Sequence, residues 1–165
     1  MWWFAASAAV VTVSAKAIAA DPGVLMAGVG MYDIIPNDNR SAALHVQYRF
    51  ADGFGASGAF RGFKPLIGGM VNSDEGAFGF AGFAAPLRLT RAWELEPSAG
   101  VGAHHQGDST FLGGTFEFHL GLGVARRFGD GLRLGVNLTH ISNANLHAKN
   151  RGTNVLMATV GWEFP

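Results

Sequence analysis

The sequence predicts an all-β protein, namely an eight-stranded antiparallel transmembrane β-barrel of the outer-membrane type. The chain of 165 residues is 48% hydrophobic but only 15% charged, and it contains 24 glycines. Much of it consists of short segments in which apolar and polar side chains alternate, as they do in half-buried β-strands. A water-soluble β-sandwich would also alternate, but it would present many more charged side chains to solvent.

The first element is an apolar leader. Residues 1–20 are rich in small side chains and end in the sequence AIAA before Asp21, which is typical of a secretory signal peptide. A transmembrane anchor is the alternative, but Lys16 and scattered Ser and Thr residues leave an apolar run shorter than the ~20 residues that a spanning helix needs. We therefore predict a signal peptide over residues 1–20 and one barrel domain over residues 21–165.

Eight alternating segments follow, separated by clusters of Gly, Asp, Asn and Pro that indicate turns. Segments of about ten residues match the tilted crossing of a bilayer by a β-strand. The predicted strands are Val24–Tyr32, Ser41–Phe50, Ser57–Phe63, Ala77–Ala85, Trp93–Ala103, Phe116–Arg127, Leu132–Ser142 and Asn154–Phe164.

The two faces of these strands differ in chemistry. From Leu132 to Thr139 the even positions carry Leu and Val, whereas the odd positions carry Arg, Gly, Asn and Thr. A transmembrane barrel turns the apolar face to lipid and encloses the polar one. The polar side chains that we expect inside the barrel are His45, Glu94, Glu96, Glu117, His119, Arg133 and Glu163.

The lengths of the connections support the same fold. Links one, three, five and seven are long in this segmentation and cover residues 33–41, 64–76, 104–115 and 143–152. Links two, four and six are shorter, as expected for a barrel with short periplasmic turns, long external loops and both termini in the periplasm. The basic residues Arg40, Lys64, Lys149 and Arg151 are then external.

Several function classes are excluded or disfavoured by composition. Twelve basic residues are balanced by twelve acidic ones, so no nucleic-acid partner is expected. The chain has no cysteine, and His104 and His105, which we expect in a solvated external loop, lack recognisable metal-ligand spacing. We therefore predict neither a metal nor an organic cofactor.

Chemistry is concentrated where the seventh predicted strand ends and the eighth begins. His140 and Ser142 share the lipid-facing parity of Leu138, and Asn154 faces lipid at nearly the same height. Side chains two residues apart on a strand lie on one face, with Cβ atoms ~6.6 Å apart. A serine, a histidine that can act as its base and a third group that orients the imidazole form the arrangement of a nucleophilic hydrolase.

The sequence of this region also resembles a known family. It reads HISNANL over residues 140–146 and continues with Asn150, Gly152 and Asn154, which resembles the C-terminal signature of the PagL family of lipid A deacylases. The strong local match covers residues 132–154, and the strand pattern fits the family from residue 24 to residue 164. The resemblance implies an eight-stranded barrel in the outer membrane of a Gram-negative bacterium, in contact with its lipids.

The resemblance also implies roles for individual residues. It implies a serine esterase that removes the acyl chain at position 3 of lipid A, with Ser142 as nucleophile and His140 as general base. Asn143 and Asn145 would help to form the oxyanion hole. The family motif often has glycine at position 145 and glutamate twelve residues after the serine, where this chain has Asn154. An amide oxygen can orient an imidazole but stabilises an imidazolium less than a carboxylate does.

Two other functions remain open from the sequence. One is a non-catalytic small barrel with a structural or adhesive role, in which the polar residues merely mark the membrane boundary. The other is a pore, which is disfavoured because side chains fill the interior of an eight-stranded barrel. The implied substrate is lipid A or lipopolysaccharide, whose phosphates the external basic residues could contact, and a homodimer is left open.

Overall fold

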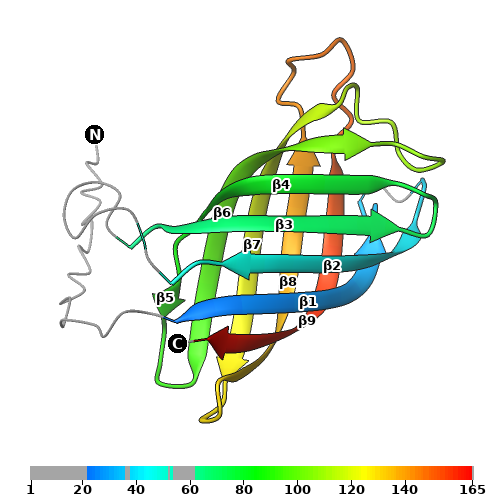
Figure 1. Ribbon diagram of the computed structural model, residues 1–165. Coiled ribbons are helices and arrows are strands. Elements are labelled where there is room, and N and C mark those ends of the chain that lie inside the picture. The colour runs from blue at the N-terminus through cyan, green and yellow to red at the C-terminus, as the bar shows by residue number, and fades with distance from the viewer. Residues whose placement is uncertain (1–21, 36–37, 52, 54–61, 165) are drawn as a thin grey trace, which may run out of the picture.

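The computed structural model describes residues 22–35, 38–51, 53 and 62–164, so the predicted signal peptide lies outside the described residues. Among the described residues, no helix has the length and apolar character needed to cross a membrane. The described chain forms eight long strands and one strand of two residues (Figure 1). They are β1 (Gly23–Tyr32), β2 (Ser41–Arg49), β3 (Lys64–Asn72), β4 (Ala77–Ala84), β5 (Leu87–Arg88), β6 (Trp93–His105), β7 (Phe116–Arg127), β8 (Leu132–Ser142) and β9 (Thr153–Phe164).

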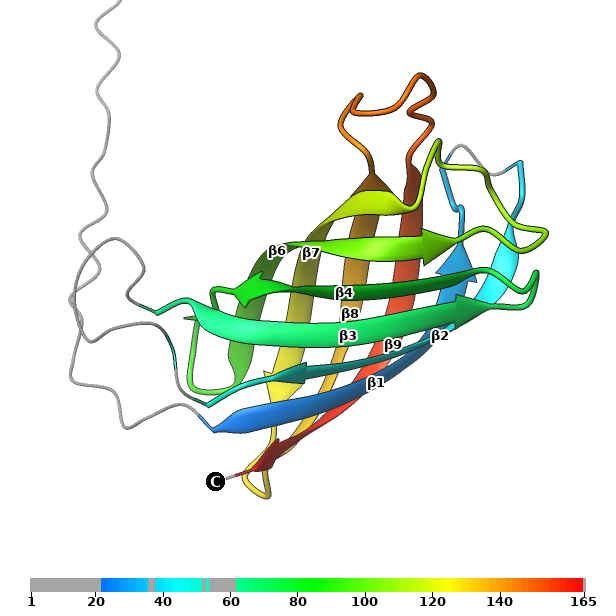
Figure 2. The same ribbon diagram turned by 45° about the horizontal axis from the view of Figure 1, so that its top comes forward.

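The long strands form one closed antiparallel sheet, which confirms the predicted fold. Each pairs with its neighbours in the chain, and closure comes from pairing of β1 with β9, while β4 pairs directly with β6. The short β5 pairs with the start of β6. Gly23 pairs with Phe164, so β1 begins and β9 ends at one end of the barrel, here called the terminal end. The β8–β9 loop projects from the opposite, distal end (Figures 1 and 2).

The outer wall is apolar, as predicted, and the lumen combines polar side chains with an apolar cluster that includes Met70, Phe78 and Phe80. All seven polar side chains that were expected inside are buried or partly buried. Trp162 and Phe164, near the end of β9, are 51% and 46% exposed on the outer wall. Other exposed apolar side chains on the wall include Val29, Leu44, Val46, Ile67, Val71, Leu120, Leu122, Leu134, Val136 and Leu138. Such a wall matches the hydrocarbon of a bilayer.

Ion pairs fill the terminal half of the lumen. Glu94, which is 2% exposed, accepts hydrogen bonds from both Arg49 and Arg133. Arg49 also pairs with Glu96, and Arg133 with Glu163. Because each charged side chain of this cluster has an opposite partner, the desolvation penalty of the cluster is offset.

The third strand differs from the prediction. The structure places β3 at Lys64–Asn72, inside the predicted external link, whereas residues 57–61 of the predicted strand Ser57–Phe63 lie outside the described residues. Pro65 and the Gly68-Gly69 pair suggested a turn, but Pro65 is near the start of the strand, where proline is tolerated. Gly68 makes room for a lumen side chain, since a Cβ there would lie 2.5 Å from the Phe80 ring.

This shift corrects two further expectations. The β3–β4 connection at the distal end is the tight turn 73–76. At the terminal end β2 stops at Arg49 and β3 starts only at Lys64, so long and short links do not alternate as predicted. Lys64 therefore begins β3 at the terminal end and is not an external residue. His104 is not a solvated loop residue either, because β6 continues to His105 and carries His104 inward, where it is 7% exposed.

Candidate functional site

Three of the predicted site residues lie together at the distal end of the outer wall. His140 and Ser142 lie in the last three residues of β8, and Asn154 is the second residue of β9. His140 and Asn154 are direct partners in the β8–β9 register. Both are half-buried, as is Ser142, and they continue the outward stripe of Leu138 on β8.

Asn154 holds the imidazole of His140. Its Oδ1 lies 3.0 Å from Nδ1 of His140, and its Nδ2 donates to the carbonyl oxygen of Ile35 at 2.8 Å. The second bond identifies the nitrogen side of the amide, so Oδ1 faces the histidine and accepts a hydrogen bond from Nδ1–H. In a neutral imidazole Nε2 then carries the lone pair.

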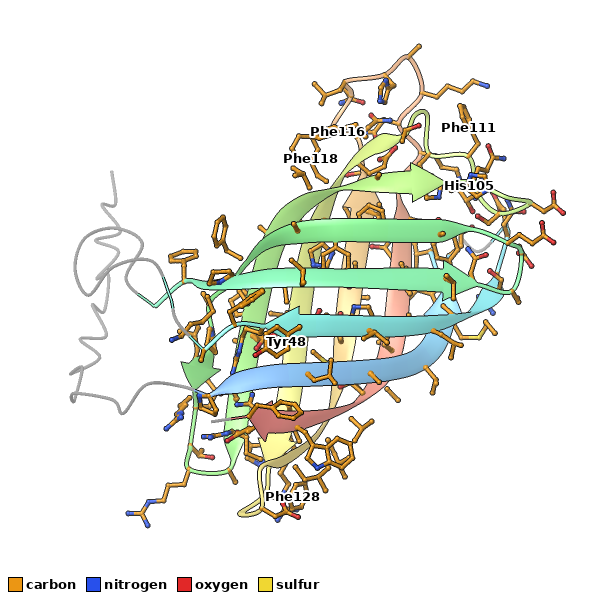
Figure 3. All side chains as sticks on the ribbon, viewed as in Figure 1. Tyr48, His105, Phe111, Phe116, Phe118 and Phe128 are labelled. Atoms are coloured by element: carbon orange, nitrogen blue, oxygen red, sulfur yellow. The ribbon has the colours of Figure 1, made fainter. Side chains whose placement is uncertain are left out.

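Ser142 lies one pleat beyond His140 on the same face. Among the described residues, the hydrogen bond of the His140 ring is to Asn154, and the Ser142 hydroxyl forms none with it. Across the β7–β8 pairing Ser142 faces Phe118, which packs edge to face against Phe116 at a centroid distance of 5.4 Å. Figure 3 shows both phenylalanines near the distal end of the barrel, below the projecting loop. The hydroxyl therefore borders an aromatic patch on the lipid side.

Gly152 lies against the imidazole. Its φ is +64°, and a Cβ built on it would lie 3.0 Å from Cε1 of His140 and 3.5 Å from Nε2. A left-handed backbone favours glycine, and the lack of a side chain leaves the ring in contact with backbone. The turn before β9 thus limits where the imidazole can lie.

Asn143 is the buried centre of the β8–β9 loop. Its Nδ2 donates to the carbonyl oxygens of Leu112 and Lys149, both at 2.7 Å, so both amide hydrogens are engaged. Its Oδ1 accepts the backbone N–H of Asn145 at 3.0 Å. The structure therefore directs the Asn143 side chain into the loop, away from Ser142.

The turn after Ser142 has an unusual backbone. Ala144 and Asn145 have φ values of 51° and 67°, and asparagine tolerates this left-handed region better than most residues. The Ala144 N–H forms no hydrogen bond with another described residue, whereas the Asn143 N–H donates to Asn150 Oδ1 at 3.2 Å. Backbone N–H groups in such a turn can form a concave anion-binding nest.

Asp33 connects the site to two other loops, although no sequence pattern marks this residue. This fully buried carboxylate accepts hydrogen bonds from the hydroxyls of Thr110 and Thr153, from the Asn39 N–H and from Arg151. Its φ of 56° marks a left-handed loop residue. Because a loop residue has no strand parity, only the folded chain shows that Asp33 joins the β1–β2 and β6–β7 loops to the start of β9.

Two basic residues of the β8–β9 loop interact with neighbouring side chains. Arg151 pairs with Asp33 and Asp38, and the Lys149 ammonium lies 5.9 Å from the centroid of the Phe111 ring. In the part of the chain that the structure describes, no group of three His, Asp or Glu side chains could hold a metal ion.

Comparison with known proteins identifies the family. The family model described as lipid A 3-O-deacylase (PagL) matches residues 71–163, which include β8, its following loop and most of β9. No curated protein sequence gives a significant match.

Two solved structures share the fold. A structure titled "Crystal structure of the outer membrane enzyme PagL" is 17% identical, with a TM-score of 0.64, over 86% of this chain and 99% of the other. A second, titled "De novo design of transmembrane beta-barrels", is 14% identical, with a TM-score of 0.54, over 87% of this chain and 97% of the other. Together with the family match, the barrel leads to one conclusion: the chain belongs to the PagL family of lipid A 3-O-deacylases of the outer membrane.

Proposed function

We propose that this lipid A deacylase is a serine esterase that uses Ser142 as nucleophile and His140 as general base. The observation that carries the proposal is the 3.0 Å hydrogen bond between Asn154 and Nδ1 of His140. That bond leaves Nε2 as the proton acceptor, and Ser142 lies on the same outward face. Asn154 takes the orienting role that a carboxylate has in other triads.

The reaction follows from these positions. Nε2 of His140 takes the hydroxyl proton as Ser142 Oγ attacks the carbonyl carbon of the 3-linked acyl ester. The tetrahedral intermediate collapses when His140 returns the proton to the departing 3-oxygen of lipid A, which leaves an acyl-serine. His140 then takes a proton from water, which attacks the acyl carbonyl carbon, and His140 returns this proton to the departing Ser142 Oγ as the fatty acid is released. The hydrogen bond between Ser142 and His140 is expected to form when substrate is bound, as catalytic hydrogen bonds often tighten in the complex.

The turn formed by residues 143–145 is the proposed oxyanion hole. The Asn143 side chain donates to loop carbonyls and its backbone N–H donates to Asn150 Oδ1. The Asn145 N–H donates to Asn143 Oδ1, so among the described residues of this turn the Ala144 N–H is the backbone donor left for the oxyanion. The Ala144 N–H and the exposed Asn145 lie in the same left-handed turn. Fixed N–H donors that point at the developing oxyanion contribute a large part of the rate enhancement in acyl-transfer catalysis.

The outer wall suggests how the substrate is held. Leu120 pairs with His140 in the β7–β8 register, and Leu138 and Leu156 lie next along β8 and β9. Their side chains are 56%, 43% and 46% exposed. An acyl chain lying on this wall would place its ester near Ser142, while the lipid A headgroup stays at the loops.

The proposal is tested by product analysis and by covalent labelling. The mature chain, folded in detergent, is incubated with lipid A, and both released fatty acid and 3-deacylated lipid A are measured by mass spectrometry. A serine-directed fluorophosphonate should label Ser142, as located by peptide mapping. Absence of product from a folded barrel with several lipid A types, or labelling at another serine without loss of activity, contradicts the proposal and favours the non-catalytic barrel.

Gly152→Ala is expected to lower deacylation about tenfold to a hundredfold, since a misplacement of about 1 Å near the chemistry can cost 10²-fold. The added Cβ lies 3.0 Å from Cε1 of His140, and φ of +64° strains alanine. The turnover number is the measured quantity. Gly79→Ala is the matched control, because a Cβ there meets nothing within 4 Å. Equal turnover in both variants would show that Gly152 does not constrain the imidazole.

A further inference from the structure

Asn154 forms two hydrogen bonds that demand an amide. Oδ1 faces Nδ1 of His140 on β8, and Nδ2 donates to the Ile35 carbonyl in the β1–β2 loop. A carboxylate could replace the first interaction but not the second, because it has no hydrogen to donate. The identity of residue 154 is therefore tied to Ile35, which lies 119 residues earlier in the chain.

The Ile35 carbonyl is held firmly in this position. The Ile34 N–H donates to the Asn154 carbonyl oxygen at 3.0 Å, which continues the contact between β1 and β9 beyond the end of the paired strands. Asp33, two residues before Ile35, is fixed by four donors, one of them the Thr153 hydroxyl directly before Asn154. Ile35 contacts Asn154 through its backbone oxygen. Its side chain is 66% exposed.

Building on the proposed function, we propose that the Ile35 carbonyl is a positioning group for the reaction. It selects the rotamer of the Asn154 amide, and the amide in turn selects the Nδ1–H tautomer of His140, which leaves Nε2 as the base. Asn154 is then a positioning residue matched to the β1–β2 loop. It is not a weakened substitute for a carboxylate.

The proposal predicts an outcome opposite to simple triad logic. In Asn154→Asp, one carboxylate oxygen would lie where Nδ2 now lies, 2.8 Å from the Ile35 oxygen, so two acceptors would meet. Either the loop or the carboxylate must move, and the imidazole follows. If residue 154 only needed to stabilise an imidazolium, the aspartate would instead be at least as active as the asparagine.

The experiment compares Asn154→Asp with Asn72→Asp, a control with the same charge change. Asn72 lies at the distal end of β3, and its Oδ1 accepts the N–H groups of Asp74 and Gly76, a role that aspartate can also fill. We expect kcat of Asn154→Asp to fall about tenfold to a hundredfold with little change in KM. The reason is that the Ile35 oxygen loses its hydrogen-bond donor and the His140 ring is displaced. Asn72→Asp should retain wild-type kcat. Activity of Asn154→Asp at or above wild type overturns the proposal.

A second measurement is independent of deacylation. Nitrogen-15 NMR of histidine-labelled protein in micelles reports the tautomer of His140, which is assigned by its absence in His140→Ala. The wild type should show the Nδ1–H form, and Asn154→Ala should lose that preference. An Nε2–H tautomer in the wild type refutes the positioning role even if lipid A is hydrolysed. Conversely, an Nδ1–H tautomer in a folded protein without activity would overturn only the proposed esterase.

The role of the loop itself is tested by a double-mutant cycle. Asp33→Asn removes the carboxylate that anchors the loop, so the kcat penalty of Asn154→Asp should shrink when the two changes are combined. An equal penalty in both backgrounds contradicts the role of the Ile35 carbonyl. Where Asp33→Asn fails to fold, the single-variant comparison and the tautomer measurement decide.

Discussion

Replacing Ser142 with alanine is expected to reduce lipid A deacylation roughly a thousandfold or more, because loss of a nucleophile removes the covalent pathway. His140→Ala should cost about as much, since the serine hydroxyl is a weak nucleophile without its base. Release of fatty acid from lipid A, followed over time in detergent, measures both effects.

The double variant discriminates between a catalytic pair and two independent contributions. Residues that act as one unit show strongly non-additive losses, so Ser142→Ala combined with His140→Ala should be little worse than either change alone. Ser73→Ala is the matched control, because Ser73 is exposed in the β3–β4 turn. Residual activity above about a tenth of wild type in Ser142→Ala would contradict the nucleophile assignment.

The second large effect concerns stability. Glu94→Gln is expected to lower the free energy of unfolding by about 3 kcal/mol, since removing one partner of a buried ion pair leaves an uncompensated charge. Two arginines, Arg49 and Arg133, lose their shared carboxylate. Unfolding by urea in detergent or lipid vesicles, followed by tryptophan fluorescence, gives the difference.

Glu75→Gln provides the matched comparison for this measurement. Glu75 is exposed in the β3–β4 turn, so the same chemical change should alter the unfolding free energy by less than about 0.5 kcal/mol. A similar small loss for Glu94→Gln would mean that the lumen charges are hydrated enough to be dispensable. The predicted contrast therefore tests whether the ion-pair cluster stabilises the barrel.

The sequence predicted most of the barrel and the placement of the catalytic candidates. Strand parity has a period of two, so a correct strand assignment fixes which side chains face outward. His140, Ser142 and Asn154 were placed on one face for this reason, and the structure brings His140 and Asn154 into direct contact. The family resemblance was confirmed, whereas the individual catalytic roles remain predictions.

The errors arose where local pattern is ambiguous. Pro65 and Gly68 are typical turn residues, which is why the sequence predicts a link here. Pro65 is compatible with β3 because it lies near the start of the strand, and Gly68 because it leaves room for the Phe80 ring. The sequence predicts a loop at His104 because apolar and polar side chains stop alternating after Ala103, although the turn residues Gly107 and Asp108 come only after His105. Neither error could be removed without knowing the cross-strand neighbours.

The contacts that orient the site depend on long-range geometry. The Ile35 carbonyl and the Asp33 carboxylate lie in a loop that no periodicity describes. Likewise, the sequence suggested Asn143 as an oxyanion contributor, but burial at 0% exposure and two loop carbonyls show that its side chain has a structural task. These are side-chain and backbone pairings between separate loops, and only the closed barrel creates them.

With the proposed site on the outer wall, the substrate is expected to arrive by lateral diffusion within the membrane. His140 and Ser142 lie on the same side of the sheet as Leu138, so the relevant substrate concentration is the mole fraction of lipid A in the surrounding leaflet. Dilution of lipid A with inert lipid should therefore slow the enzyme even when the total amount of lipid A in the sample is unchanged. The encounter between the protein and lipid A is expected to take place in two dimensions. The deacylation rate should then also depend on how tightly lipids pack around the barrel.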